Sequence, residues 1–182
     1  MKWGYVHDGE HIPELGNNWR KKYKTLSVDE ALSNNVGTCI ERVEVAKDGL
    51  RNLGFNPTSF CIRDSNIVKS NSGHCFAVYN VDGIWNWFES SLERNKGIHT
   101  FDCLDELLGT VIPIYFKQES LQPTYNWLIS EYDDIPGNLS YAEFSAVMDY
   151  TQMPKEIIGS AFNPKNARIL RPSTEELITI KY

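Results

Sequence analysis

The sequence of 182 residues lacks a long apolar run, a basic stripe and a regular cysteine framework. A membrane-spanning helix needs about 18 consecutive apolar residues, and the start of the chain shows no apolar stretch of the kind that directs secretion. We therefore expect a cytoplasmic protein that neither spans a membrane nor is exported. The formal net charge of −6, with one short basic cluster at residues 20–24, disfavours nucleic acid as a partner.

The cysteines are few, and their irregular spacing is not typical of a disulfide scaffold. We interpret all four as thiols. The chain also lacks a cysteine pair or a histidine–glutamate helix motif that would hold a metal. His7 and His11, with acidic neighbours Asp8 and Glu10, are interpreted as a solvated segment, so no metal or cofactor is expected.

What the chain does have is enough apolar material for one core, with 41% hydrophobic and 12% aromatic residues. This length fits a single domain over residues 1–182. The patterns predict helices and strands in the following places. Helices are expected at 27–32, 103–108, 125–132 and 140–150, strands at 58–63, 111–116 and 167–170, and a loop at 94–100.

The most informative stretch is the start of a helix at Cys39. Thr38 and Glu41 have the spacing of a capping box, in which each side chain satisfies a backbone N–H group of the first turn. Apolar residues follow at helical spacing, and Gly54 comes after the last of them. Cys39 is therefore the expected first helical residue, where the helix dipole and free N–H groups stabilise a thiolate.

A predicted β-hairpin carries a histidine and an acid. Residues 73–81 and 84–89 are rich in aromatic and β-branched types and flank an Asp-Gly dipeptide, which is typical of a two-residue hairpin loop. In that register His74 and Glu89 are diagonal neighbours on one face of the sheet. A three-residue loop would move Glu89 to the other face. The carboxylate of Glu89 could then orient the imidazole of His74.

Each of these residues also has a simpler interpretation. Cys39 alone could be a small apolar residue packed under a helix, and His74 alone a strand histidine with a satisfied hydrogen bond. Cys103 is a rival nucleophile at another capped helix start, with His99 four residues upstream, but the surrounding acidic residues oppose a thiolate there. Cys61 and Cys75 are expected in the core, with Cys75 turned away from the helix of Cys39.

The order of a helix-borne cysteine, a strand histidine and an acid on the next strand resembles the transglutaminase-like branch of the papain-like cysteine enzymes, in a small bacterial or phage type. The matching blocks are Gly37-Thr38-Cys39, Gly73-His74 and Trp85-Asn86-Trp87-Phe88-Glu89. Relatives commonly have an aromatic residue after the cysteine and an aspartate as the third member, whereas this chain has Ile40 and Glu89. The Gly-Thr-Cys block is also similar to arylamine N-acetyltransferases, which share the fold, although this chain is short for one.

The resemblance implies an α+β fold with a papain-like core at about 25–116 and a C-terminal extension at about 117–182. It also implies a thiol-dependent acyl-transfer enzyme. Cys39 would be the nucleophile, His74 the general base and Glu89 the residue that orients His74. The implied substrate is a protein or peptide, whose peptide, isopeptide or amide bond is hydrolysed through a thioester. The alternatives are transfer of the acyl group to an amine, and a non-catalytic binding module that retains the fold. Asn17, Asn18, Trp19 and Trp3 are candidate side-chain donors to an oxyanion.

Overall fold

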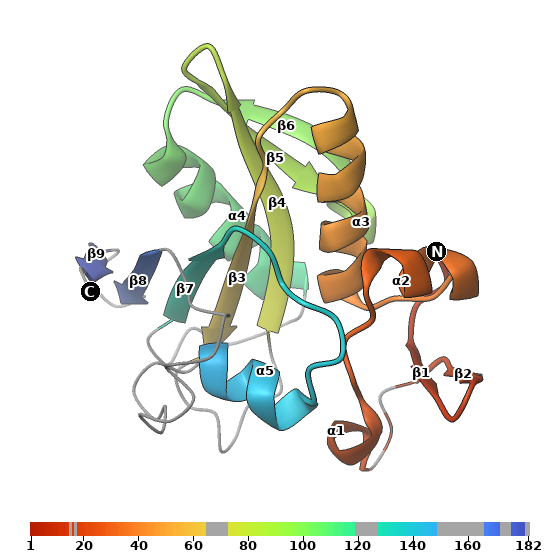
Figure 1. The fold of residues 1–182 in the computed structure, drawn as a ribbon. Helices are drawn as coiled ribbons and strands as arrows, with labels where there is room; N and C mark the ends of the chain where they lie inside the picture. Colours follow the sequence, from red (N-terminus) through yellow and green to blue (C-terminus); the bar gives the residue numbers. More distant parts are fainter. Residues whose placement is uncertain are drawn as a thin grey trace.

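The computed structural model describes residues 1–14, 16, 18–64, 73–118, 127–148, 166–171 and 176–180. These residues form an α+β fold in which helices flank an antiparallel sheet (Figure 1). The helices are α1 (Trp19–Lys22), α2 (Val28–Asn34), α3 (Cys39–Asn52), the 3₁₀ helix η1 (Glu93–Asn95), α4 (Leu104–Gln118) and α5 (Tyr141–Met148). The strands are β1 (Tyr5–His7), β2 (Glu10–Ile12), β3 (Thr58–Asp64), β4 (Gly73–Val81), β5 (Ile84–Glu89), β6 (Gly97–Phe101), β7 (Trp127–Tyr132), β8 (Asn166–Arg171) and β9 (Glu176–Ile180).

The main sheet has seven strands within the described ranges, in the order β6-β5-β4-β3-β7-β8-β9. Neighbouring strands in this order are antiparallel throughout. Helix α3 covers one face of this sheet and α4 lies on the other (Figure 1). Strands β1 and β2 form a separate two-stranded hairpin near the N-terminus.

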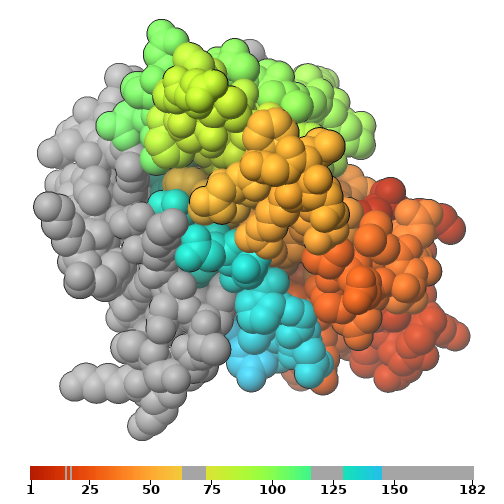
Figure 2. Space-filling model, turned by 45° about the horizontal axis from the view of Figure 1, so that its top comes forward, coloured from red at the N-terminus to blue at the C-terminus, as the bar shows by residue number. Residues whose placement is uncertain are grey.

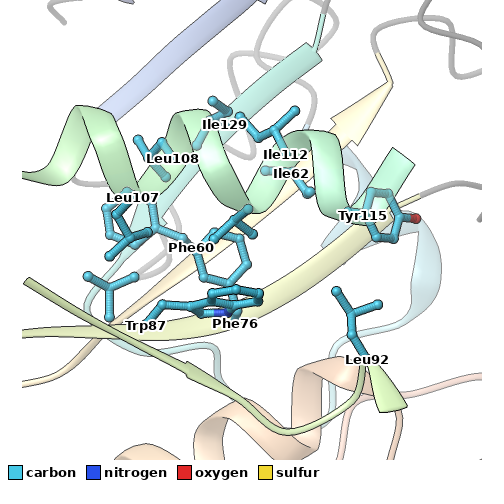
Figure 3. Close-up of a cluster of buried hydrophobic side chains, with 12 residues drawn as sticks. Phe60, Ile62, Phe76, Trp87, Leu92, Leu107, Leu108, Ile112, Tyr115 and Ile129 are labelled. Carbon is cyan, nitrogen blue, oxygen red and sulfur yellow. The ribbon is translucent and has the colours of Figure 1, made fainter. Parts of the chain in front are cut away.

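Alternation along the strands divides the buried side chains between the two faces. On the α4 face, Phe76 and Trp87 pack with Leu107 and Leu108 in one cluster, and Figure 3 shows the helix lying across these strand residues. On the α3 face, Cys75 and its strand neighbours pack with Ile40 and Val43. The central strands are therefore buried on both sides, which fixes their register.

The predicted helix starts around the motif are confirmed. Ser27 and Glu30 form a capping box at α2, and Thr38 and Glu41 form one at α3. Cys39 is the first residue of α3, as the capping pattern predicts. The predicted strand at 58–63 corresponds to β3 and the strand at 167–170 to β8. Of the helix predicted at 140–150, residues 141–148 form α5, and residues 149–150 lie outside the described residues.

Three predicted segments differ from the structure. Residues 111–116 continue helix α4 rather than forming a strand, because their apolar side chains belong to the stripe that α4 buries on the sheet. Of the loop expected at 94–100, residues 97–100 belong to β6, which pairs with β5. Of the helix expected at 125–132, residues 127–132 are strand β7, which pairs with β3 and extends the sheet, and residues 125–126 lie outside the described residues.

In the described part of the chain, the helices are all too short or too polar to cross a bilayer.

Candidate active site

The first turn of α3 is held by a buried carboxylate. Glu41, which is 2% exposed, accepts hydrogen bonds from the backbone N–H of Thr38 at 2.8 Å and from its hydroxyl at 2.6 Å. The phenol of Tyr23 donates to the same carboxylate at 2.8 Å. Burial, followed by the charge of Glu41, raises the pKa of Tyr23 well above its ordinary value, so the phenol stays a neutral donor. These contacts fix the backbone from which the side chain of Cys39 projects.

His74 and Glu89 meet on the hairpin as its register requires. Positions 81 and 84 pair across the two-residue loop, so the predicted register is confirmed. Nε2 of His74 lies 2.8 Å from Oε2 of Glu89. Both side chains are almost fully buried, at 3% and 2% exposure, so water does not compete for this bond.

The thiol of Cys39 completes a group of three, because its interaction with the imidazole helps to raise the pKa of His74. In Figure 1, strand β4 begins at the end of the sheet where α3 also begins, which explains how a helix on one face reaches a histidine on the other. Nε2 of His74 is engaged by Glu89, so Nδ1 is the ring nitrogen that this bond leaves available. Cys39 is partly exposed, so it is the member of the three that an incoming molecule can reach.

The environment of His74 favours its charged form. Burial, the largest single influence, lowers the pKa of His74, but the hydrogen bonds to Cys39 and Glu89 and the negative charges of both partners outweigh it. Together they raise the pKa of His74 from 6.5 to about 9. An imidazolium held between a thiol and a carboxylate can share its protons with both, which is the arrangement that general acid–base catalysis needs.

The carboxylate of Glu89 is saturated with donors. Oε2 accepts from the indole N–H of Trp87 at 3.2 Å in addition to its bond with His74. Oε1 accepts from the backbone N–H groups of Ser91 at 2.6 Å and Leu92 at 2.9 Å. Burial alone would raise the pKa of Glu89, but the bonds and charge of His74 and these backbone donors lower it. The turn after β5 thus holds the side chain of Glu89, which is longer than that of an aspartate, in place.

One residue of this site was missed by the sequence analysis. The ring of Tyr115, from α4, is stacked on the imidazole of His74, and Figure 3 shows it at the end of the α4 cluster. Assigning residues 111–116 to a strand concealed this contact. The signal that could have revealed it is the helical spacing of Leu107, Leu108, Val111, Ile112 and Tyr115, which are all buried.

Two predictions about the cysteines were wrong. Cys61 and Cys75 are paired across β3 and β4 and form a disulfide, so only Cys39 and Cys103 are free thiols. Cys75 does not point away from α3 but packs in the cluster with Ile40 and Val43. His74, its neighbour in the strand, is the residue that faces α4.

The rival candidates lie in other surroundings. Cys103 is exposed, and its sulfur accepts from the backbone N–H of Glu106 at 3.4 Å in the first turn of α4. His99, its expected partner, instead contacts the carbonyl of Asn95 at 2.7 Å and stacks on Trp87. The structure therefore brings no histidine to Cys103 in any contact that it describes.

The structure gives the suggested oxyanion donors different surroundings. Trp19 packs edge-on against Tyr23 and Tyr141, and Asn18 adopts a left-handed backbone conformation before α1. Trp3 lies beneath the guanidinium of Arg42. Asn17 falls outside the described residues. The backbone N–H of Cys39, at the first helical position, lacks an acceptor within the helix.

Comparisons with known proteins add no relative. No family model, curated protein or solved structure matches the chain. Within the ranges that the structure describes, no group of three or more histidine, cysteine, aspartate or glutamate side chains is arranged to hold a metal ion. The arrangement of Cys39, His74 and Glu89 is thus the feature on which a functional proposal can be based.

Proposed function

We propose that this protein is a thiol-dependent acyl-transfer enzyme in which Cys39 is the nucleophile, His74 the acid–base and Glu89 the residue that orients His74. The observation that carries the proposal is the imidazole of His74, which is hydrogen-bonded to the carboxylate of Glu89 and whose pKa is raised by its interaction with the thiol of Cys39. A helix N-terminus under the sulfur adds a field that favours the thiolate. The motif blocks and their order further support a transglutaminase-like, papain-like core.

In the first half of the cycle, the Cys39 thiolate attacks the carbonyl carbon of an amide, peptide or isopeptide bond. The carbonyl oxygen becomes negative, and the free N–H of Cys39 is placed to receive part of that charge. Imidazolium His74 gives its proton to the leaving amine as the carbon–nitrogen bond breaks. The acyl group then remains on the sulfur as a thioester.

In the second half, His74 removes a proton from the acyl acceptor as that acceptor attacks the thioester. Water would release an acid and make the protein a hydrolase, whereas an amine would form a new amide. Hydrolysis of a peptide or isopeptide bond is the reaction we propose. Glu89 stabilises the imidazolium throughout, because its charge and its bond to Nε2 persist in both steps.

An electrophilic peptide probe library tests this proposal, since a covalent adduct identifies both the residue and the accepted acyl group. We expect mass spectrometry to find the adduct on Cys39. The variant Cys39→Ala should lose labelling and any turnover, while Cys103→Ala, which removes the other free thiol, should keep both. Addition of a primary amine to the reaction distinguishes amide formation from hydrolysis.

Reaction with iodoacetamide at different pH values separates an enzyme from a binding module of the same fold. If the three groups are assembled for catalysis, Cys39 should reach half of its maximal alkylation rate at a lower pH than the exposed Cys103. Faster labelling of Cys103 with an inert Cys39 would contradict the enzyme proposal.

A further inference from the structure

Arg42 joins the elements that carry the ends of the proposed catalytic group. It lies three residues after Cys39, in the first turn of α3, and so shares one side of the helix with the nucleophile. Its Nη1 donates to the carbonyl of Ser90 at 3.3 Å. Ser90 directly follows Glu89 and begins the turn whose N–H groups hold the Glu89 carboxylate.

The same guanidinium also binds the N-terminal segment. Its Nη2 donates to the carbonyl of Met1 at 2.9 Å, and its central carbon lies 5.5 Å from the centre of the Trp3 ring. The flat, forked guanidinium suits such a set of contacts, in which it donates to two carbonyls and stacks on an indole at once. Arg42 therefore links three chain segments at one point.

The N-terminal segment is itself attached to the loop that precedes Cys39. The N–H of Lys2 donates to the carbonyl of Asn35 at 2.7 Å, and the N–H of Gly37 donates to the carbonyl of Lys2 at 3.0 Å. A Cβ atom at Gly37 would lie only 2.6 Å from Cε of Met1 and 2.7 Å from Cβ of Glu41, so this packing requires glycine. Figure 2 shows the red N-terminal residues on the same side of the molecule as the orange residues of α2 and α3.

We propose that Arg42 is a positioning residue for the thiol–imidazole–carboxylate group, which it aligns by tying the start of α3 to the turn after β5. This inference rests on the proposed function. Cys39 and Glu89 each contact His74 from a different element, so the distance between these elements decides whether both contacts form at once. A displacement of about 1 Å in such a group can reduce a rate by as much as about a hundredfold.

The test compares Arg42→Met and Arg42→Lys with the matched control Arg51→Met. Arg51 lies on the same helix and also binds a loop with a forked guanidinium, through Asp134 at 2.7 Å and the carbonyl of Asp133 at 3.0 Å. Iodoacetamide alkylation of Cys39 across the pH range is the readout, because it requires no known substrate. Thermal unfolding of each variant is measured in parallel.

We expect Arg42→Met to slow the alkylation of Cys39 near neutral pH by about tenfold or more and to move its half-maximal rate to higher pH. Arg42→Lys should also slow the alkylation of Cys39, because an ammonium group keeps the positive charge but not the forked pair of donors. Arg51→Met should lower the melting temperature without changing the pH profile. If Arg42→Met does not fold, Arg42→Lys decides the question.

An unchanged profile in Arg42→Met, or a wild-type profile in Arg42→Lys, would overturn the positioning role. The second result would mean that charge alone is what matters at this position. Failure of the proposed function would give a different result. In that case Cys39 of the wild-type protein would be alkylated no faster than Cys103, and would not reach its half-maximal rate at a lower pH.

Discussion

The phenol ring of Tyr115 lies almost parallel to the imidazole of His74, with ring centroids 5.2 Å apart and planes inclined by 9°. This contact comes from α4, on the face of the sheet opposite α3. A ring held in this way has less freedom to turn out of line with Cys39 and Glu89. Helix α4 therefore acts on the site through the orientation of His74.

We expect Tyr115→Leu to slow alkylation of Cys39 near neutral pH by about tenfold, whereas Tyr115→Phe, which keeps the stacked ring, should retain more of the rate than the leucine variant. Leucine removes the stacked ring, whereas phenylalanine retains it. A contact between two aromatic rings contributes about 0.5–1.5 kcal/mol. A suitable control is Tyr79→Leu, which removes the tilted ring contact of Tyr79 with Phe55 elsewhere in the chain. Equal effects of both leucine variants on the alkylation rate would argue that only general stability is involved.

The charge of Glu89 should govern the titration of His74. In Glu89→Gln the hydrogen-bond shape is kept but the negative charge is lost, so the pKa of His74 should fall from about 9 toward or below 6.5. Nuclear magnetic resonance of the imidazole protons measures this directly, because the chain has only four histidines. The matched control is Glu93→Gln, which neutralises an exposed acid paired with Lys96 and should leave the His74 titration in place.

The sequence was sufficient to predict the parts of the site that depend on local rules. The capping box at Thr38 and Glu41 determines where α3 begins, and the Asp-Gly loop determines the hairpin register. Both patterns involve residues close together in the chain, so their geometry follows without knowledge of the fold. The bond between His74 and Glu89 is a direct consequence of that register.

What the sequence did not predict depends on contacts between distant segments. The residues around Pro113 have the β-branched and aromatic character of a strand, yet they are helical because a stripe of their side chains packs on the sheet. The disulfide between Cys61 and Cys75 requires the pairing of β3 with β4, which no spacing rule specifies. The contacts of Arg42 with Ser90 and Met1 are likewise set only by tertiary structure.

The raised pKa of His74 makes the stability of the protein depend on pH. The pKa is about 9 in the folded state and about 6.5 in an unfolded chain. Below pH 6.5 the imidazole is charged in both states, and the full stabilisation is present. As the pH rises from 6.5 to about 9 the unfolded chain loses this proton before the folded protein does, so the stabilisation declines.

The difference corresponds to on the order of 3 kcal/mol, at 1.36 kcal/mol for each pH unit. Urea unfolding at a series of pH values in the wild type and in His74→Gln measures it. Between pH 6.5 and 9, the free energy of unfolding of the wild type should fall by this difference more than that of His74→Gln. Parallel stability curves for the two proteins would show that His74 is not held as an imidazolium.

A separate buried ion pair ties α3 to the sheet away from His74. The ammonium of Lys47 is fully buried and donates to Glu44 at 2.9 Å, to the hydroxyl of Ser59 at 2.7 Å and to the carbonyl of Asp133 at 2.6 Å. The hydroxyl of Ser59 in turn donates to Glu44 at 2.6 Å. Both charges are thus matched by partners inside the protein, as buried charges must be.

Because the pair is buried, removing one partner should cost more than removing both. Lys47→Met leaves the charge of Glu44 without its cation, which should lower the free energy of unfolding by about 3–5 kcal/mol. The double variant Glu44→Leu with Lys47→Met removes both charges and should recover most of this loss. Urea unfolding measures the stability of all three proteins, and the alkylation profile of Cys39 should stay unchanged in every variant that folds. A loss below about 1 kcal/mol in Lys47→Met, the range of exposed ion pairs, would contradict the burial of this network.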